Sequence, residues 1–117
     1  MEGREKQRPI DLAHLARYTG GEASLDADIL QLFATQSAEQ LRALHAALEA
    51  RDAESWRRIA HSLKGAARGI GAFVLADVAA DAEAVDALAQ TEAPRILSTL
   101  EAEANTVQAF IAAYLAA

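Results

Sequence analysis

The 117-residue sequence contains no cysteine, which excludes disulfide bonds, thiolate catalysis and cysteine-ligated metal sites. This absence fits a reducing compartment. The sequence also lacks any run of about 18 apolar residues that could span a membrane. Its first residues, MEGREKQRP, are charged and do not form the apolar core of a signal peptide. We therefore expect a cytoplasmic protein that does not associate with membranes.

Basic residues are fewer than acidic ones, 11 against 17, and the formal net charge is −6. Proteins that bind nucleic acids normally carry a basic excess that contacts the phosphates. A nucleic-acid partner is therefore not expected. Against this acidic background, a local cluster of basic residues would be informative.

Aromatic residues are also scarce, with one Trp, two Tyr and three Phe, and β-branched residues are too sparse for a sheet protein. Alanine, by contrast, occurs 30 times. It is the best helix former, and its small side chain lets helices approach closely. The length suits one domain with a single core. We predict one all-α domain.

Glycine and proline are few and divide the chain into segments. Residues 1–8 are polar and are predicted to be a disordered tail. Asp11 can cap a short helix that carries Leu12 and Leu15 inward and stops at Gly20-Gly21.

A long amphipathic helix is predicted over residues 23–50, with Ser24 or Asp26 as its N-cap. Its apolar residues recur at three-and-four spacing, namely Ile29, Leu32, Phe33, Leu41, Leu44 and Leu48. Asp52 is a good cap for the next helix, over residues 53–69, which Gly69 and Gly71 would end.

Two more helices complete the prediction. One covers residues 73–89 and turns four apolar residues inward, Leu75, Val78, Ala82 and Val85. The other has Pro94 in its first turn and an apolar stripe of Ile96, Leu100, Ala104, Val107, Ile111 and Tyr114. Short connections make successive helices antiparallel neighbours. Residues 9–117 are therefore predicted to form an antiparallel up-down four-helix bundle with a short N-terminal capping helix.

A helical wheel of residues 54–70 separates two faces. The apolar face consists of Trp56, Ile59, Leu63, Ala66, Ala67 and Ile70. His61 lies opposite its centre and is predicted to be exposed. The residues around His61 on the wheel are Glu54, Arg57, Arg58, Lys64, Gly65 and Arg68. Up to four cations therefore flank an exposed histidine.

This outward face is not explained by stability alone. Glycine within a helix costs about 1 kcal/mol relative to alanine, and like charges one turn apart are mildly destabilising. The absence of a side chain at Gly65 would let another molecular surface approach the imidazole. The basic residues are useful if His61 acquires negative charge.

An exposed histidine such as His61 can serve three kinds of chemistry. A metal site is not expected, because His14, His45 and His61 are far apart in the sequence and cations repel a metal. General acid–base catalysis needs a pocket and an orienting partner, which a convex helix face lacks. Nucleophilic attack by the imidazole on a phosphoryl group remains, with Lys64 and Arg68 balancing part of the charge. His14 and His45 are expected to be ordinary residues.

The segment His61-Ser62-Leu63-Lys64-Gly65, followed by Gly71-Ala72, resembles the H-x-x-K-G signature of histidine-containing phosphotransfer (Hpt) domains. These domains are the relay intermediates of multistep two-component signalling. The order and lengths of the helices, and the place of the motif in the second bundle helix, resemble the family over roughly residues 9–116.

The resemblance implies that His61 is phosphorylated through its outer nitrogen, that Lys64 steadies the phosphoryl group, and that Gly65 leaves room for the partner. The implied partner is a receiver domain of a response regulator or hybrid kinase, which supplies the aspartate and the Mg²⁺. The chain itself would need no cofactor. Arg68 departs from the small residues usual after K-G; with Arg57 it is a further candidate for contact with the phosphoryl group or the partner.

The leading hypothesis is therefore a monomeric phosphoryl carrier that has no glycine-rich nucleotide-binding segment and is not itself a kinase. The alternatives are the histidine-bearing first domain of a chemotaxis-type kinase, a non-phosphorylated helical adaptor, and a dimeric kinase-like phosphotransferase. A docking surface near His61 should expose an apolar patch, for which Leu12, Leu15 and Ile29 are candidates.

Overall fold

The computed structural model describes residues 8–117, and over this range the regular secondary structure is entirely helical. Most of the predicted disordered tail, residues 1–7, lies outside the described residues. The five helices are α2 (Leu12–Thr19), α3 (Ala23–Glu49), α4 (Ala53–Ile70), α5 (Phe73–Ala84) and α6 (Glu92–Ala116).

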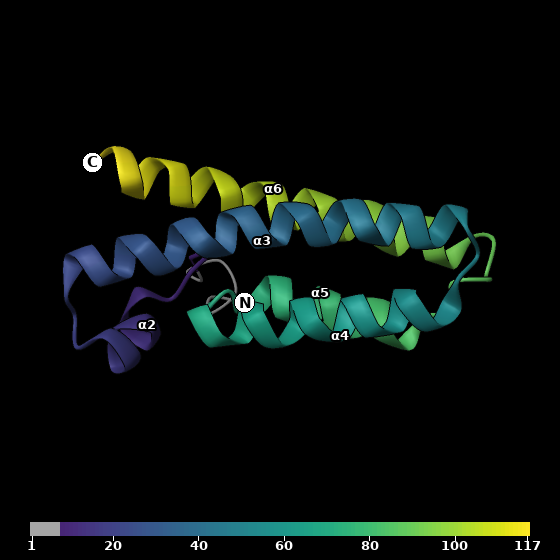
Figure 1. Cartoon of the computed structure of the whole chain (residues 1–117), viewed down its shortest axis with the longest axis horizontal. Coiled ribbons are helices and arrows are strands. Elements are labelled where there is room, and N and C mark those ends of the chain that lie inside the picture. The colour runs from purple at the N-terminus through teal and green to yellow at the C-terminus, as the bar shows by residue number, and fades with distance from the viewer. Residues whose placement is uncertain (1–7) are drawn as a thin grey trace.

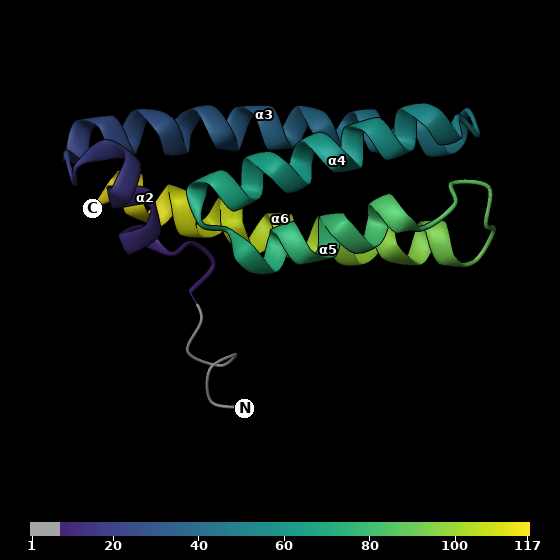
Figure 2. The same ribbon diagram turned by 90° about the horizontal axis from the view of Figure 1, so that it is seen from below.

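Helices α3 to α6 form the predicted antiparallel four-helix bundle (Figure 1). Each packs against the next in sequence, and α6 closes the bundle by packing against α3. The short α2 lies across one end, against α3 and α4, as the view turned by 90° shows (Figure 2). In the described part of the chain, every helix is too short or too polar to cross a membrane.

The core of the bundle is built from leucine and many alanines, so the helices approach closely. A buried side chain, Trp56, and a partly buried one, Gln108, also connect helices through hydrogen bonds to backbone carbonyls. The indole Nε1 of Trp56 in α4 donates to the carbonyl oxygen of Ala82 in α5 at 2.8 Å. The amide Nε2 of Gln108 in α6 donates to the carbonyl oxygen of Ala34 in α3, also at 2.8 Å.

Several predicted helix ends are confirmed. Asp11 and Asp52 cap α2 and α4, and each side chain accepts a hydrogen bond from the backbone N–H three residues on. Gly20 and Gly71 end the same two helices in the left-handed conformation. Gly69, which was predicted to help end α4, instead lies inside it.

Other predicted ends were wrong. Helix α3 begins after Glu22, which makes no side-chain cap, and Ser24 and Asp26 lie in its first turns. Helix α5 ends at Ala84, not at residue 89, because Val85 is extended. Residues after the end of α5 still pack inward, Ala87 among them. The apolar spacing therefore continues although the helix has ended.

The N-terminal segment is joined to the end of α4. The backbone N–H of Asp11 donates to the carbonyl oxygen of Gly71 at 2.9 Å. At Gly71, φ is +90°, and a Cβ atom would lie 2.7 Å from the backbone oxygen of Asp11. Only glycine fits this position without strain.

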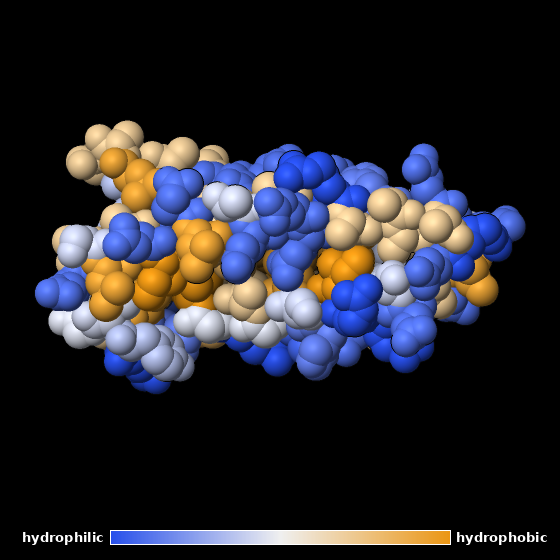
Figure 3. Space-filling model, in the orientation of Figure 1, coloured by the Kyte–Doolittle hydropathy of each residue, from blue (hydrophilic) through white to orange (hydrophobic). Residues whose placement is uncertain are grey.

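The three candidates for an exposed apolar patch, Leu12, Leu15 and Ile29, are not among the exposed residues. Leu15 is buried, and Leu12 and Ile29 are largely covered by the core. The large apolar side chains exposed in this region are Tyr18, Leu25 and Leu32, although Leu32 was predicted to face inward. Figure 3 shows apolar residues gathered at the end of the molecule where α2 and the start of α3 lie.

Candidate functional site

Helix α4 presents His61 to solvent, as the wheel predicts. Its inward face buries Trp56, Leu63 and Ala67 completely or almost so, whereas the His61 side chain is 65% exposed. The Asp52 carboxylate fixes the start of the helix by accepting from the backbone N–H and the hydroxyl of Ser55, at 3.1 and 2.7 Å. The exposed imidazole therefore stands on a well-anchored helix.

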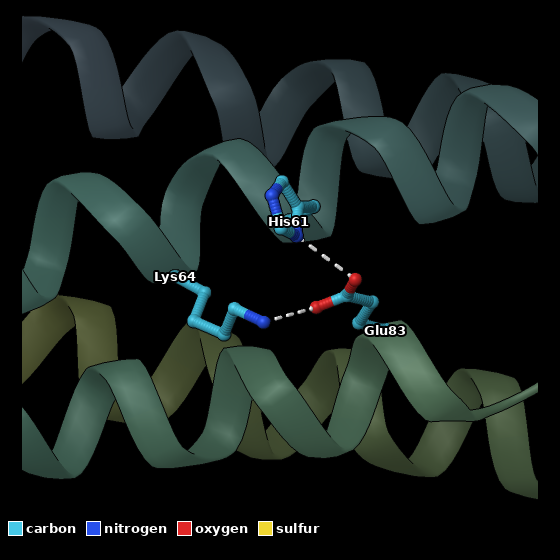
Figure 4. Close-up of polar contacts among 3 residues, drawn as sticks. All are labelled: His61, Lys64 and Glu83. Atoms are coloured by element: carbon cyan, nitrogen blue, oxygen red, sulfur yellow. Dashed lines mark hydrogen bonds and ion pairs between the residues drawn. The ribbon is translucent and has the colours of Figure 1, made fainter.

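A carboxylate from the neighbouring helix contacts both His61 and Lys64 (Figure 4). Glu83, near the end of α5, places Oε2 at 2.9 Å from Nδ1 of His61 and Oε1 at 2.8 Å from Nζ of Lys64. The side chains of Glu83 and Lys64 are only 24% and 21% exposed. Two oxygens of one carboxylate thus bridge two residues of the signature motif.

This bridge sets the ionisation of Glu83. The hydrogen bond from Lys64 lowers the pKa of Glu83, and the hydrogen bond and charge of His61 act in the same direction, while partial burial opposes them. Glu83 is therefore ionised at neutral pH and can only accept hydrogen bonds. It follows that Nδ1 of His61 carries the proton.

The other ring nitrogen, Nε2, points away from Glu83 (Figure 4). It makes no hydrogen bond to another of the described residues. In the neutral imidazole with a proton on Nδ1, Nε2 holds the free lone pair. The structure therefore presents an exposed ring nitrogen with a free lone pair, and a carboxylate holds the opposite side of the ring.

Glu83 lies on another helix and was not predicted as a site residue. The free positive charge beside His61 is smaller than predicted, because Lys64 is paired with Glu83. Within residues 8–117, Arg57, Arg58 and Arg68 make no ion pair with a carboxylate.

Arg57 and Arg58 precede His61 along α4, whereas Arg68 follows it. Arg57 and Arg58 line an open surface depression that also includes His61 and Glu83. Arg68 is exposed one turn beyond Lys64. Gly65 is also exposed, and a Cβ atom added there would meet no atom within 4 Å. The surface beside the imidazole is therefore open at Gly65, as predicted.

The other two histidines have different surroundings. His45 places Nε2 at 3.0 Å from the carboxylate of Glu101, between α3 and α6. The His14 ring packs edge-on against Tyr18 and Phe73. Across residues 8–117, no group of three or more His, Asp or Glu side chains is arranged to hold a metal ion.

The sequence of residues 28–110 matches the family model of the Hpt domain. The chain belongs to the Hpt domain family. This Hpt domain is also similar to the crystal structure of histidine-containing phosphotransfer protein B (HptB) from Pseudomonas aeruginosa PAO1. The two are 32% identical, and the match covers 88% of this chain and 90% of that one with a TM-score of 0.80. No curated protein sequence matches the chain.

These matches establish the all-helical Hpt fold and the general function. The chain is a histidine phosphotransfer protein of phosphorelays. The matched range includes α4 and α5 in full, and therefore His61, Lys64 and Glu83.

Proposed function

We propose that His61 carries the phosphoryl group on Nε2 and exchanges it with the aspartate of receiver domains. The observation that carries this assignment is the bond between Nδ1 and the ionised Glu83, which leaves the exposed Nε2 as the nucleophile. His45, the other histidine of the matched range, has the opposite arrangement, because its Nε2 contacts Glu101.

The transfer can be written with this chain's own atoms. The Nε2 lone pair of His61 attacks the phosphorus of an aspartyl phosphate, and the bond between phosphorus and the aspartate oxygen breaks. The aspartate leaves as a carboxylate, so no proton has to be removed from the imidazole. The ring becomes cationic while Nδ1 keeps its proton, and Glu83 stabilises that charge. The reverse reaction follows the same path.

The remaining site residues act around this step. Lys64 lies one turn after His61 and neutralises part of the negative charge of the phosphoryl group. Its ammonium group also remains paired with Glu83. Gly65 leaves the space through which the receiver reaches Nε2. Arg57 and Arg68, exposed on either side of His61 along α4, contribute charge to the phosphoryl group or the acidic receiver site.

The chain acts in this proposal as a cytoplasmic, monomeric carrier. The receiver supplies the aspartate and its Mg²⁺, so the carrier needs only an accessible, correctly protonated imidazole. The surface beside His61 is an open depression, which suits docking against another protein.

The test is transfer from a receiver domain phosphorylated with labelled phosphate. Wild type and His61→Gln are compared, with His45→Gln as the matched control. Acid-labile, base-stable label is expected on wild type and His45→Gln and not on His61→Gln. Label retained by His61→Gln would refute the assignment.

Two further arms separate the alternative functions. Incubation of the chain alone with labelled ATP is expected to leave it unlabelled, whereas labelling would favour a kinase. A folded wild-type protein that binds receivers but takes no label from any of them would favour an adaptor.

A further inference from the structure

Trp56 connects the helix that bears His61 to the helix that bears Glu83. Its side chain is 1% exposed. Its indole Nε1 donates to the carbonyl oxygen of Ala82 at 2.8 Å. Ala82 immediately precedes Glu83, and Trp56 lies five residues before His61 on α4. The bond therefore joins the two helices directly beside the Glu83 bridge.

The last turn of α5 packs its inward face into the core, where Ala82 is fully buried, but few hydrogen bonds hold its carbonyls. The last carbonyls of a helix have no partner within the helix, and helix ends fray. Helix α5 ends at Ala84 with no basic residue in its last turn, and its C-cap residue, Val85, is extended. The carbonyl oxygen of Ala82 accepts two hydrogen bonds. One comes from the indole of Trp56, and the other comes from the backbone N–H of Val85 at the longer distance of 3.2 Å.

Glu83 can bridge only if this last turn is accurately placed. Its two contacts, 2.9 Å to His61 and 2.8 Å to Lys64, are near the best hydrogen-bond length. A displacement of the turn by about 1 Å would put both beyond hydrogen-bonding distance. A closed ring of contacts is formed by the Trp56 bond, the Ala82–Glu83 peptide, the Glu83–His61 bond and the segment of α4 from Trp56 to His61.

We propose that Trp56 is a positioning residue for His61. Its indole N–H holds the last turn of α5 where Glu83 reaches Nδ1 of His61, and so keeps the proton on Nδ1 and the lone pair on Nε2. The consequence for phosphoryl transfer rests on the proposed function, whereas the effect on the His61 tautomer does not.

The variant Trp56→Phe keeps a large aromatic ring and removes the donor. A second variant replaces Trp56 with its benzothienyl isostere, in which sulfur stands for the indole N–H, and this change preserves the shape of the core. The matched control is Gln108→Met, which removes the corresponding bond from Gln108 to Ala34 at 2.8 Å, between α6 and α3. Glu83→Ala defines the unbridged state of His61.

The measurement is the pair of ¹⁵N chemical shifts of the His61 ring in the full, unphosphorylated chain. It is made at about pH 8.5, where a histidine side chain is ordinarily neutral. Wild type and Gln108→Met are expected to show predominantly the tautomer with the proton on Nδ1. Both Trp56 variants are expected to lose it and approach the shifts of Glu83→Ala. Transfer from a phosphorylated receiver should slow severalfold in the Trp56 variants and not in Gln108→Met.

Wild-type shifts in the benzothienyl variant would overturn the proposal, since the N–H would then be dispensable. Equal loss of the Nδ1 tautomer in Gln108→Met would also overturn it, because general loosening of the bundle would suffice. If the Phe variant does not fold, the isostere gives the result alone. Failure of the proposed function would appear separately, as label on His61→Gln with the tautomer shifts unaffected.

Discussion

Gly65 gives the sharpest test of the idea that α4 sacrifices stability for access to His61. It lies in the interior of the helix, is exposed, and has nothing within 4 Å of the position where a Cβ atom would stand. A Cβ atom at this position therefore meets no obstacle within the folded chain, and the exposed position leaves a longer side chain free to extend into solvent. The variants Gly65→Ala and Gly65→Gln should fold, and both should be more stable than the wild type.

The size of the gain follows from helix propensity. Glycine costs about 0.5–1 kcal/mol relative to alanine within a helix, and glutamine is nearly as good a helix former as alanine. A 117-residue domain has an unfolding entropy of about 0.25 kcal/mol/K near its midpoint. Gly65→Ala should therefore raise Tm by about 2–4 °C, and Gly65→Gln by slightly less.

Gly69 provides the matched control, because it is also exposed, helical and free of neighbours at the Cβ position. Gly69 lies about two turns beyond His61. The variant Gly69→Gln should therefore stabilise the folded chain without slowing phosphoryl transfer. Thermal melts followed by circular dichroism give Tm, and rapid-quench labelling from a phosphorylated receiver gives the transfer rate. Gly65→Gln should be the variant that is more stable and much slower. Transfer at the wild-type rate by Gly65→Gln, or a fall in its Tm, would refute the reasoning.

Three other predictions concern Lys64, Gly71 and Glu83. Lys64→Ala should slow transfer while changing Tm by no more than a few degrees, since a partly exposed ion pair contributes little to stability; a large fall in Tm would make Lys64 structural. Gly71→Ala should destabilise the fold by more than about 1 kcal/mol in denaturant titrations, because φ is +90° and the Cβ would collide with the Asp11 backbone; an unchanged midpoint would contradict this. The lowered pKa of Glu83 means that its ionised form stabilises the folded state above pH 4.5, the ordinary value, and that this contribution is lost as the pH falls through the lowered value. The Tm difference between wild type and Glu83→Gln should therefore be present at neutral pH and disappear on acidification; a difference that persists in strong acid would show that charge is not its origin.

The sequence predicts the bundle well because the residues that begin and end the helices act locally. Asp11 and Asp52 cap helices by accepting from the backbone three residues on, and Gly20 and Gly71 end them with positive φ. These interactions depend on a few adjacent residues. The exposure of His61 is also a local property, since it follows from the periodicity of one helix.

The errors occur where local preference and tertiary packing disagree. The periodicity of residues 73–89 continues past Val85, but the chain leaves the helical conformation there and still packs Ala87 inward. Apolar spacing records which residues face the core and not which backbone conformation brings them there. Leu32 satisfies the spacing of α3 yet is 56% exposed, because the buried face of this stretch of α3 passes through Leu30 and Phe33 and not through Leu32.

Glu83 was missed because a wheel of one helix carries no information about its neighbour. The relevant signal lies in the register of the α4–α5 hairpin. His61 and Glu83 are equally distant in sequence from Ala72, which lies in the short connection. An antiparallel pair of helices brings such residues to the same level along the bundle.

That register changes the electrostatic interpretation of the site. The predicted cluster of four cations becomes one neutralised pair, Lys64 with Glu83, and three arginines that make no close ion pair within residues 8–117. Before phosphorylation the lysine and the imidazole N–H share one carboxylate. In the proposed transfer, Nε2 carries the phosphoryl group, the same carboxylate faces a cationic ring, and Lys64 is attracted both to Glu83 and to the phosphoryl oxygens. Under that proposal Glu83 links the charge of the imidazole to the position of Lys64, and the arginines add positive charge that the paired Lys64 does not supply.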